Sequence, residues 1–149
     1  MALNFNQFAA EANTFLKEYT KELSLNGDID KAGRILSSIL HGLREVIPME
    51  ESLQLMAQFP MFLKAVYVNG WSSRIRKEKV KNMTEFIDLI REFDGNTSIY
   101  DFESDEVAES YIIATFISLR KYISLGELED IRTGLPKDLK HMVYHNIMF

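Results

Sequence analysis

The chain contains an internal repeat, and this repeat restricts the possible folds more than any other feature of the sequence. Residues 32–64 align without a gap to residues 108–140, at a shift of 76 positions, and eight of the 33 aligned pairs are identical. Most other apolar positions of the first stretch stay apolar in the second. A repeat of this kind predicts one structural unit that occurs twice, with neighbouring copies that bury a common core.

The identical pairs are spread over the whole aligned stretch. They are Ala32/Ala108, Leu43/Leu119, Arg44/Arg120, Ile47/Ile123, Glu51/Glu127, Pro60/Pro136, Leu63/Leu139 and Lys64/Lys140. A second match lies upstream at a shift of 78, where residues 4–8 correspond to residues 82–86. Both segments begin with Asn and carry Gln or Glu three residues later, which is a capping-box pattern. We therefore predict one domain of two repeats, about 4–71 and 82–147, joined by a basic linker over residues 72–81.

The apolar spacing within each repeat is typical of α-helices. Residues 32–47 form a continuous apolar stripe at steps of three and four, which fits the 3.6-residue period, and residues 108–123 repeat it. Ser124 begins another capping box, and the prolines fit the first turns of further helices. No stretch shows a convincing strand alternation. We predict an all-α fold of about eight helices, in two tandem four-helix units packed about an approximate two-fold axis.

The chain has 149 residues and a mass of 17.3 kDa, which is the size of one domain. A unit of about 70 residues is marginally stable alone, so we expect the two repeats to share a core. The chain has no cysteine, which excludes disulfides, thiolate catalysis and zinc–thiolate sites. We recognise no signal peptide and no membrane-spanning stretch, so we expect a cytoplasmic protein.

The net charge of −5 argues against general affinity for nucleic acid, because such affinity depends on lysine and arginine contacts to phosphates. The basic linker departs from this balance, with five basic residues against Glu78. Arg74, Arg76 and Lys77 are therefore candidate contacts to phosphate, in nucleic acid or at a membrane surface. The linker has no aromatic residue for stacking on bases, which favours a plain charged connection between two acidic bundles.

The second repeat resembles a bacterial family of unknown function. Residues 126–140 read GELEDIRTGLPKDLK and are similar to a Gly-Gly-Glu and Gln-Leu-Pro-x-x-Leu-Arg stretch of the domain of unknown function family numbered 2267. Residues 58–64 are a degenerate counterpart, and Gly134 stands where the family often has Gln. The likeness extends from about Phe5 to Ile147. It implies a small helical bacterial protein and assigns no catalytic residue.

Two histidines near the C-terminus have a spacing that suits a metal. His141 and His145 lie one helical turn apart, as do pairs that bind Zn, Ni or Cu. Met142 follows His141 where a metalloprotease helix has Glu, so that chemistry is excluded. Two surface histidines without a metal are the simpler interpretation, and we assign no cofactor. The acidic run from Asp101 to Glu106 lacks the register of a calcium loop, and we expect a solvated loop there.

Two charged positions recur in both repeats. Arg44 and Arg120 lie near the ends of the long predicted helices, and Glu51 and Glu127 lie shortly after them. We predict a structural ion pair between arginine and glutamate in each repeat, bracing the corner between two helices. The alternative is a pair of symmetric anion-binding sites.

Phe62, Tyr67 and Trp71 form an aromatic cluster near the junction of the repeats. Burial between the repeats is the simplest interpretation of this cluster. Exposed aromatic side chains would instead favour a groove for a protein partner, so Tyr67 and Trp71 are interaction candidates.

The sequence contains no nucleophile–base pair, phosphate loop or dinucleotide fingerprint that we recognise. We therefore expect a non-enzymatic helical module that acts by contacts to an unknown protein partner or to itself. One alternative is a carrier of a small ligand or metal with a cavity between the repeats, since helical bundles hold sites in their cores. Another is weak nucleic-acid binding through the basic linker, although nucleic acid is not the expected partner. We expect no membrane partner.

Overall fold

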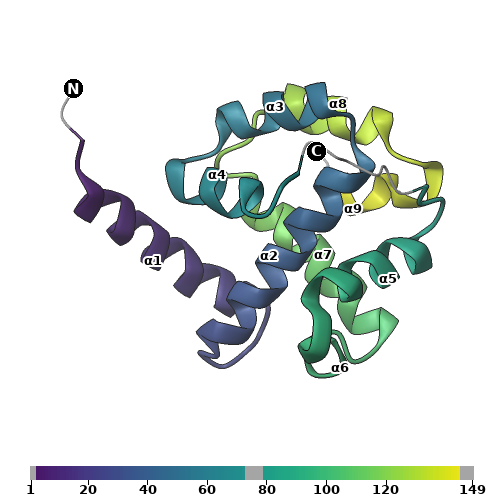
Figure 1. Ribbon diagram of the computed structural model, residues 1–149, viewed down its shortest axis with the longest axis horizontal. Helices are drawn as coiled ribbons and strands as arrows, with labels where there is room; N and C mark the ends of the chain where they lie inside the picture. The colour runs from purple at the N-terminus through teal and green to yellow at the C-terminus, as the bar shows by residue number, and fades with distance from the viewer. Residues whose placement is uncertain (1–2, 73–78, 145–149) are drawn as a thin grey trace.

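A computed structural model describes residues 3–72 and 79–144 of the chain. These residues form α-helices and short 3-10 helices and contain no β-strand, which confirms the all-α prediction (Figure 1). The elements are α1 (Phe5–Glu22), α2 (Ile29–Val46), α3 (Met49–Gln58), α4 (Met61–Val68), α5 (Met83–Asp94), η1 (Gly95–Thr97), α6 (Ser98–Asp101), α7 (Asp105–Leu119), α8 (Leu125–Gly134), η2 (Lys137–Leu139) and α9 (Lys140–Tyr144). The short helices η1 and α6 were not predicted from the sequence.

Local side-chain caps fix where most of the longer helices begin. In each case a polar side chain before the helix accepts a hydrogen bond from a backbone N–H three residues later, which satisfies one otherwise unpaired donor. The capping residues are Asn4, Asp28, Asn82, Ser104 and Ser124. Pro48 and Pro60 precede α3 and α4, where the missing backbone N–H costs no helical hydrogen bond.

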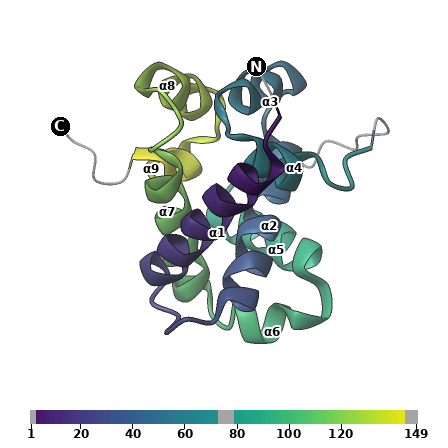
Figure 2. The same cartoon turned by 90° about the vertical axis from the view of Figure 1, so that its left-hand side faces the viewer.

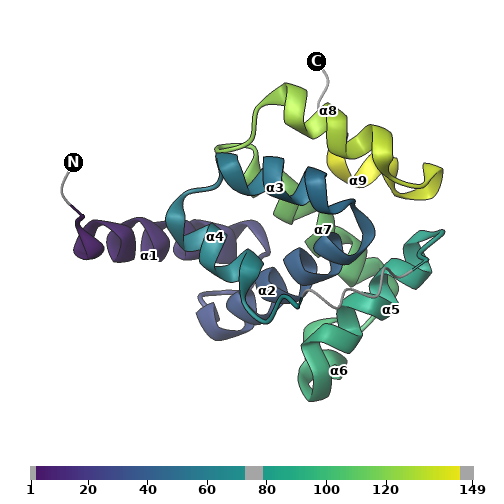
Figure 3. The same ribbon diagram turned by 45° about the horizontal axis from the view of Figure 1, so that its top comes forward.

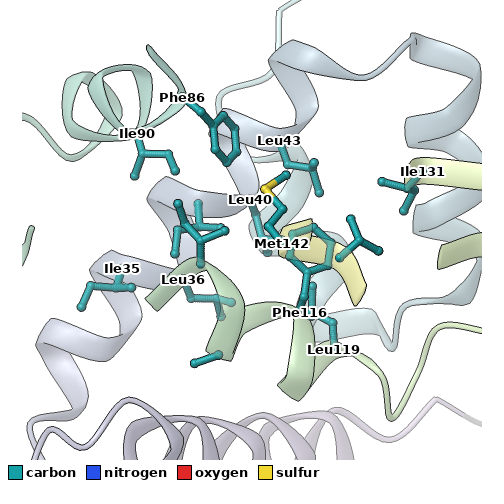
Figure 4. Close-up of a cluster of buried hydrophobic side chains, with 14 of the residues drawn as sticks. Ile35, Leu36, Leu40, Leu43, Phe86, Ile90, Phe116, Leu119, Ile131 and Met142 are labelled. Carbon is teal, nitrogen blue, oxygen red and sulfur yellow. The ribbon is translucent and has the colours of Figure 1, made fainter. Parts of the chain in front are cut away.

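The helices pack around one continuous core. Helices α3 and α8 lie side by side, and α2 and α7 cross the middle of the molecule beneath them (Figures 1 and 2). The α5 and α6 segment packs on one side of this centre, and α1 lies on the other (Figure 3). Side chains from five helices meet in the core that Figure 4 draws: Ile35, Leu36, Leu40, Leu43, Phe86, Ile90, Phe116, Leu119, Ile131 and Met142.

Helices α2 and α5 approach each other closely at Gly42 of α2. A Cβ atom built on Gly42 would lie 2.9 Å from Cγ1 of Ile90 and 3.5 Å from a ring carbon of Phe86, both on α5. Real Cβ atoms do not come so close to a neighbouring carbon, so α2 and α5 pack at this distance because position 42 has no side chain.

Helix α6 corrects the expectation of a solvated acidic loop. Asp101 ends this helix, and its side chain is fully buried. Nε and Nη2 of Arg34 on α2 donate to its two carboxylate oxygens at 2.8 and 2.9 Å. The short helix turns Asp101 towards α2, where this bidentate pair satisfies the buried charge.

Among the described residues, no helix has the length and apolar character that a bilayer crossing needs.

Candidate functional site

Helix α1 carries an apolar stripe that extends beyond the helices that cover it. Phe5, Phe8, Ala12, Phe15 and Tyr19 follow one another at helical spacing on one face. Phe15 and Tyr19 are buried, whereas Phe5 keeps 69% of its surface exposed. The first half of α1 extends away from the other helices (Figures 1 and 3). An apolar helix face without a covering element is a feature of interaction sites.

The rings of the free half already contact one another. Phe5 and Phe8 make an edge-to-face contact with ring centroids 5.9 Å apart. Their geometry is favourable for aromatic pairs, but the pair leaves most of Phe5 in solvent.

An apolar groove lies at the base of this free half. It has a volume of about 480 Å³ and runs between α1, α2 and α4. Ala12, Phe15 and Leu16 of α1 line it together with residues of the other two helices, which are Gly33, Leu36, Ser37, Phe62, Ala65, Val66 and Asn69. Small side chains on all three helices leave this space open. The groove and the free half of α1 together are named the docking surface below.

Phe15 joins the docking surface to the core. Its ring lies 5.4 Å from the ring of Phe62 on α4, 5.7 Å from that of Tyr19 and 5.9 Å from that of Tyr122. Through these three ring contacts, Phe15 packs the second half of α1 against the groove wall.

The free half of α1 is also nearly uncharged. Between residues 3 and 14, Glu11 is the one ionisable side chain, and it forms a hydrogen bond with Gln7 at 3.1 Å. Charged residues begin again at Lys17 and Glu18, beyond the groove-lining part of the helix. An apolar partner could therefore cover this segment without burying many charges.

A second cluster lies where α3 and α8 meet. Glu51 of α3 and Glu127 and Asp130 of α8 each place a carboxylate oxygen within 4.8 Å of the others. Glu127 is 5% exposed, and its Oε2 atom is buried without a hydrogen-bond partner. Burial, together with the neighbouring Glu51 and Asp130 carboxylates, raises the pKa of Glu127 to about 8. Oxygen ligands arranged in this way suit hard divalent cations.

The predicted ion pairs between the recurring arginines and glutamates are wrong. Nη1 of Arg44 donates instead to the backbone carbonyls of Tyr67 and Asn69, at 2.7 and 2.8 Å. These carbonyls lie at the end of α4, so the guanidinium caps the negative end of that helix. Burial lowers the pKa of Arg44. The glutamates meet each other rather than the arginines, because α3 and α8 pack side by side.

The aromatic cluster is largely internal. Tyr67 is fully buried, and its hydroxyl lies 2.7 Å from that of Ser52. Trp71 packs edge-on against Tyr67, with ring centroids 5.6 Å apart, and the guanidinium of Arg44 lies 5.8 Å from its ring centroid. Phe62 is half-buried and lines the groove. Of these three aromatic residues, Phe62 therefore lines the docking surface, whereas the buried side chain of Tyr67 packs α4 onto the core.

The predicted histidine and basic sites fall partly outside the described residues. Nε2 of His141 lies 3.0 Å from a carboxylate oxygen of Glu109 on α7. His145 lies outside the described part of the chain, as do Arg74, Arg76 and Lys77 of the basic linker. The metal and phosphate contacts predicted for these residues stay predictions.

A pair of neighbouring carboxyl groups, one buried and one half-buried, was not predicted from the sequence. Asp94 of α5 lies beside Asp101, and its Oδ1 accepts a hydrogen bond from Ser38 at 3.2 Å. Burial and the neighbouring carboxyl group of Asp101 raise the pKa of Asp94 to about 6. From the sequence, this acidic run was recognised only as lacking the residue order of a calcium loop. That pattern does not indicate the contact with Arg34, which lies 67 residues away from Asp101.

The match to a protein family covers most of these elements. No curated protein sequence matches the chain. The sequence model of a family described as an uncharacterised conserved protein, DUF2267, matches residues 12–142, from the middle of α1 to α9. The chain therefore belongs to the DUF2267 family.

Proposed function

We propose that this protein is a non-enzymatic helical module that pairs with a second copy of itself through the docking surface. The observation that carries the proposal is the apolar stripe of α1, which is buried at Phe15 and Tyr19 and exposed at Phe5. In the pair, the free half of each α1 lies against the groove of the other copy. Such an arrangement is closed and two-fold symmetric, as most homodimers are.

A second copy fits this surface because the surface is complementary to itself. One part of it is a protruding apolar helix, and the other is an apolar hollow next to that helix. A two-fold pair presents each protrusion to the hollow of the partner. The near absence of charge between residues 3 and 14 means that two identical segments come together with little repulsion.

The aromatic residues of the free half supply much of the expected affinity. Full burial of a Phe side chain contributes about 1.5–3 kcal/mol, and about 1.4 kcal/mol corresponds to a tenfold change in Kd. Removing the ring of Phe5 should therefore weaken the pair by about tenfold or more. The same substitution should leave the core unchanged, since Phe5 is largely exposed in one copy.

Sedimentation equilibrium of the full chain over a wide concentration range tests the proposal. The wild-type protein should dimerise, and Phe5→Ser and Phe8→Ser should shift the dimer to higher concentration. Ile99→Ser is the matched control, because Ile99 is 71% exposed and lies on α6, away from the docking surface. A chain that stays monomeric throughout, or a control that weakens the dimer equally, would refute self-association.

We further propose that each chain consists of two tandem four-helix units related by approximate two-fold symmetry. Two helix pairs that the repeat equates, α2 with α7 and α3 with α8, contact each other. Glu51 and Glu127 occupy equivalent positions and lie together, as expected beside a two-fold axis. The proposal predicts that superposing α2–α4 on α7–α9 places Arg44 on Arg120. A best superposition that pairs other residues would contradict it.

A further inference from the structure

The contact between α3 and α8 holds two buried carboxylate oxygens without a donor. Oε2 of Glu51 and Oε2 of Glu127 are both inaccessible to solvent, and neither has a hydrogen-bond partner. Glu127 as a whole is 95% buried, as its 5% exposure implies. An unpaired buried carboxylate is strongly destabilising, so native structures pair such groups with a donor, a proton or a metal ion.

The surroundings of this pair add negative charge. Asp130 follows Glu127 by three residues on α8, so its carboxylate lies on the same face of the helix. The neighbours that act on the Glu127 carboxyl are Glu51 and Asp130, both acidic, with the buried phenol of Tyr67 nearby. Ser52 is next to Glu51 on α3, but its hydroxyl is engaged by Tyr67 at 2.7 Å.

We propose that Glu51, Glu127 and Asp130 form a binding site for one hard divalent cation, which joins α3 to α8. Three oxygen ligands and no nitrogen or sulfur ligand favour Ca²⁺, Mg²⁺ or Mn²⁺ over Zn²⁺ or Cu²⁺. The three oxygens lie within 4.8 Å of one another. Opposite oxygens around Ca²⁺ are about 4.6–5.2 Å apart and those around Mg²⁺ about 4.0–4.2 Å apart. Because 4.8 Å is within the span of opposite oxygens around Ca²⁺, one such ion can reach all three carboxylates.

The exposure of the three residues also suits an ion that enters from solvent. Glu127 is buried and Glu51 half-buried, whereas Asp130 is exposed. Asp130 thus lies at the mouth of the site, and water completes the coordination on that side. The site is separate from the docking surface, which lies between α1, α2 and α4.

A shared proton is the competing explanation for the carboxyl pair. Without a cation, a proton held between Glu51 and Glu127 would relieve their repulsion. With a cation, that proton is displaced, so binding at neutral pH releases protons. Calorimetric titration with cations separates a cation site from a shared proton alone, because the proton alone gives no saturable binding heat.

Titration of the chelator-treated full chain with CaCl₂, MgCl₂ and MnCl₂ tests the site, by calorimetry and by thermal melting. The expected result is saturable binding of one ion per chain, a rise in Tm, and proton release. Glu127→Gln and Glu51→Gln should weaken binding by about tenfold or more and keep the fold, because an amide can donate to the remaining carboxylate. Glu106→Gln, an exposed substitution on α7, is the control.

Two results would overturn the proposal. One is the absence of heat and of a Tm shift with all three cations at millimolar concentration, which would leave the shared proton as the explanation. The other is binding that Glu127→Gln leaves intact, which would place the ion elsewhere. Both Gln variants should melt cooperatively without metal, so a loss of binding is separable from a loss of fold.

Discussion

Tyr19 of α1 donates its phenolic hydrogen to Oγ1 of Thr115 on α7, at a distance of 2.7 Å and across 96 residues of sequence. The direction of this bond follows from a second one, because Thr115 donates its own hydrogen to the carbonyl of Tyr111 at 2.7 Å. Both side chains are fully buried, and burial raises the pKa of Tyr19. The bond attaches the second half of α1 to the central helix and leaves the first half free.

Thr115→Val should destabilise the protein more than Tyr19→Phe does. The valine variant leaves the Tyr19 hydroxyl buried without an acceptor, at a cost of about 1–3 kcal/mol. The phenylalanine variant removes one hydrogen bond, worth about 1 kcal/mol, and Thr115 keeps its bond to Tyr111. Urea unfolding of both variants and of the double variant measures this. Additive effects in the double variant would show that the two hydroxyls are not coupled.

Removing Arg34 should be costly, because Asp101 would remain buried and charged. Burial pushes the pKa of Asp101 upward, but the two bonds from Arg34 outweigh it and hold that pKa below its usual value. Arg34→Met should cost about 3–5 kcal/mol at pH 7, whereas the double variant with Asp101→Asn should cost less. Equal losses in the single and double variants, measured by denaturant unfolding, would contradict this account.

The stability of the metal-free protein should fall as pH rises from 7 to 8. The pKa of Glu127 is about 8 in the folded chain against an ordinary value of 4.5, so the folded state binds the extra proton over this interval. Stability is then lost as that proton dissociates, by at most about 1.4 kcal/mol per pH unit. Glu127→Gln should remove this part of the slope. Asp94, with a pKa of about 6, contributes below this interval. Identical slopes for wild type and variant would argue against a proton at Glu127.

Gly42→Ala should destabilise the core, although alanine favours helices. The added methyl would meet Ile90 on α5 at 2.9 Å, and such overpacking costs about 1–3 kcal/mol. Gly33→Ala in the same helix is the matched control, because no atom lies within 4 Å of its added Cβ. The control should be neutral or stabilising by up to about 1 kcal/mol. Thermal melting compares the two, and a more stable Gly42→Ala protein would disprove the close approach.

Short-range features of the fold were predictable from the sequence, and long-range pairings were not. The capping box at Asn82 was recognisable because its two residues are close in sequence. The Asn82 side chain accepts a hydrogen bond from the backbone N–H of Glu85, three residues later. The pair of Arg34 and Asp101 spans 67 residues and depends on how α6 turns, which no local pattern encodes. The repeat equated Glu51 with Glu127, but it could not show that α3 and α8 would bring the two carboxylates together.

The docking surface was missed for a related reason. The sequence analysis marked residues 4–8 only as the start of a helix, and apolar residues at helical spacing, such as those of α1, are normally core. Phe5 and Phe15 look alike in that pattern, but one is 69% exposed and the other buried. The difference arises because the other helices cover only the second half of α1. How much of α1 they cover depends on how those helices pack, which the pattern of α1 does not contain.

A mixed disulfide between two copies tests the pairing of docking surfaces most directly. The chain has no cysteine, so Ala9→Cys and Ala65→Cys each create a single thiol, one on the exposed free half of α1 and one in the groove, and both keep the rings of Phe5 and Phe8. When the two variants are mixed and oxidised, the mixed dimer should form faster than with Leu125→Cys, an exposed control on α8, in place of Ala65→Cys. Equal rates with the groove and control cysteines would contradict self-association through α1.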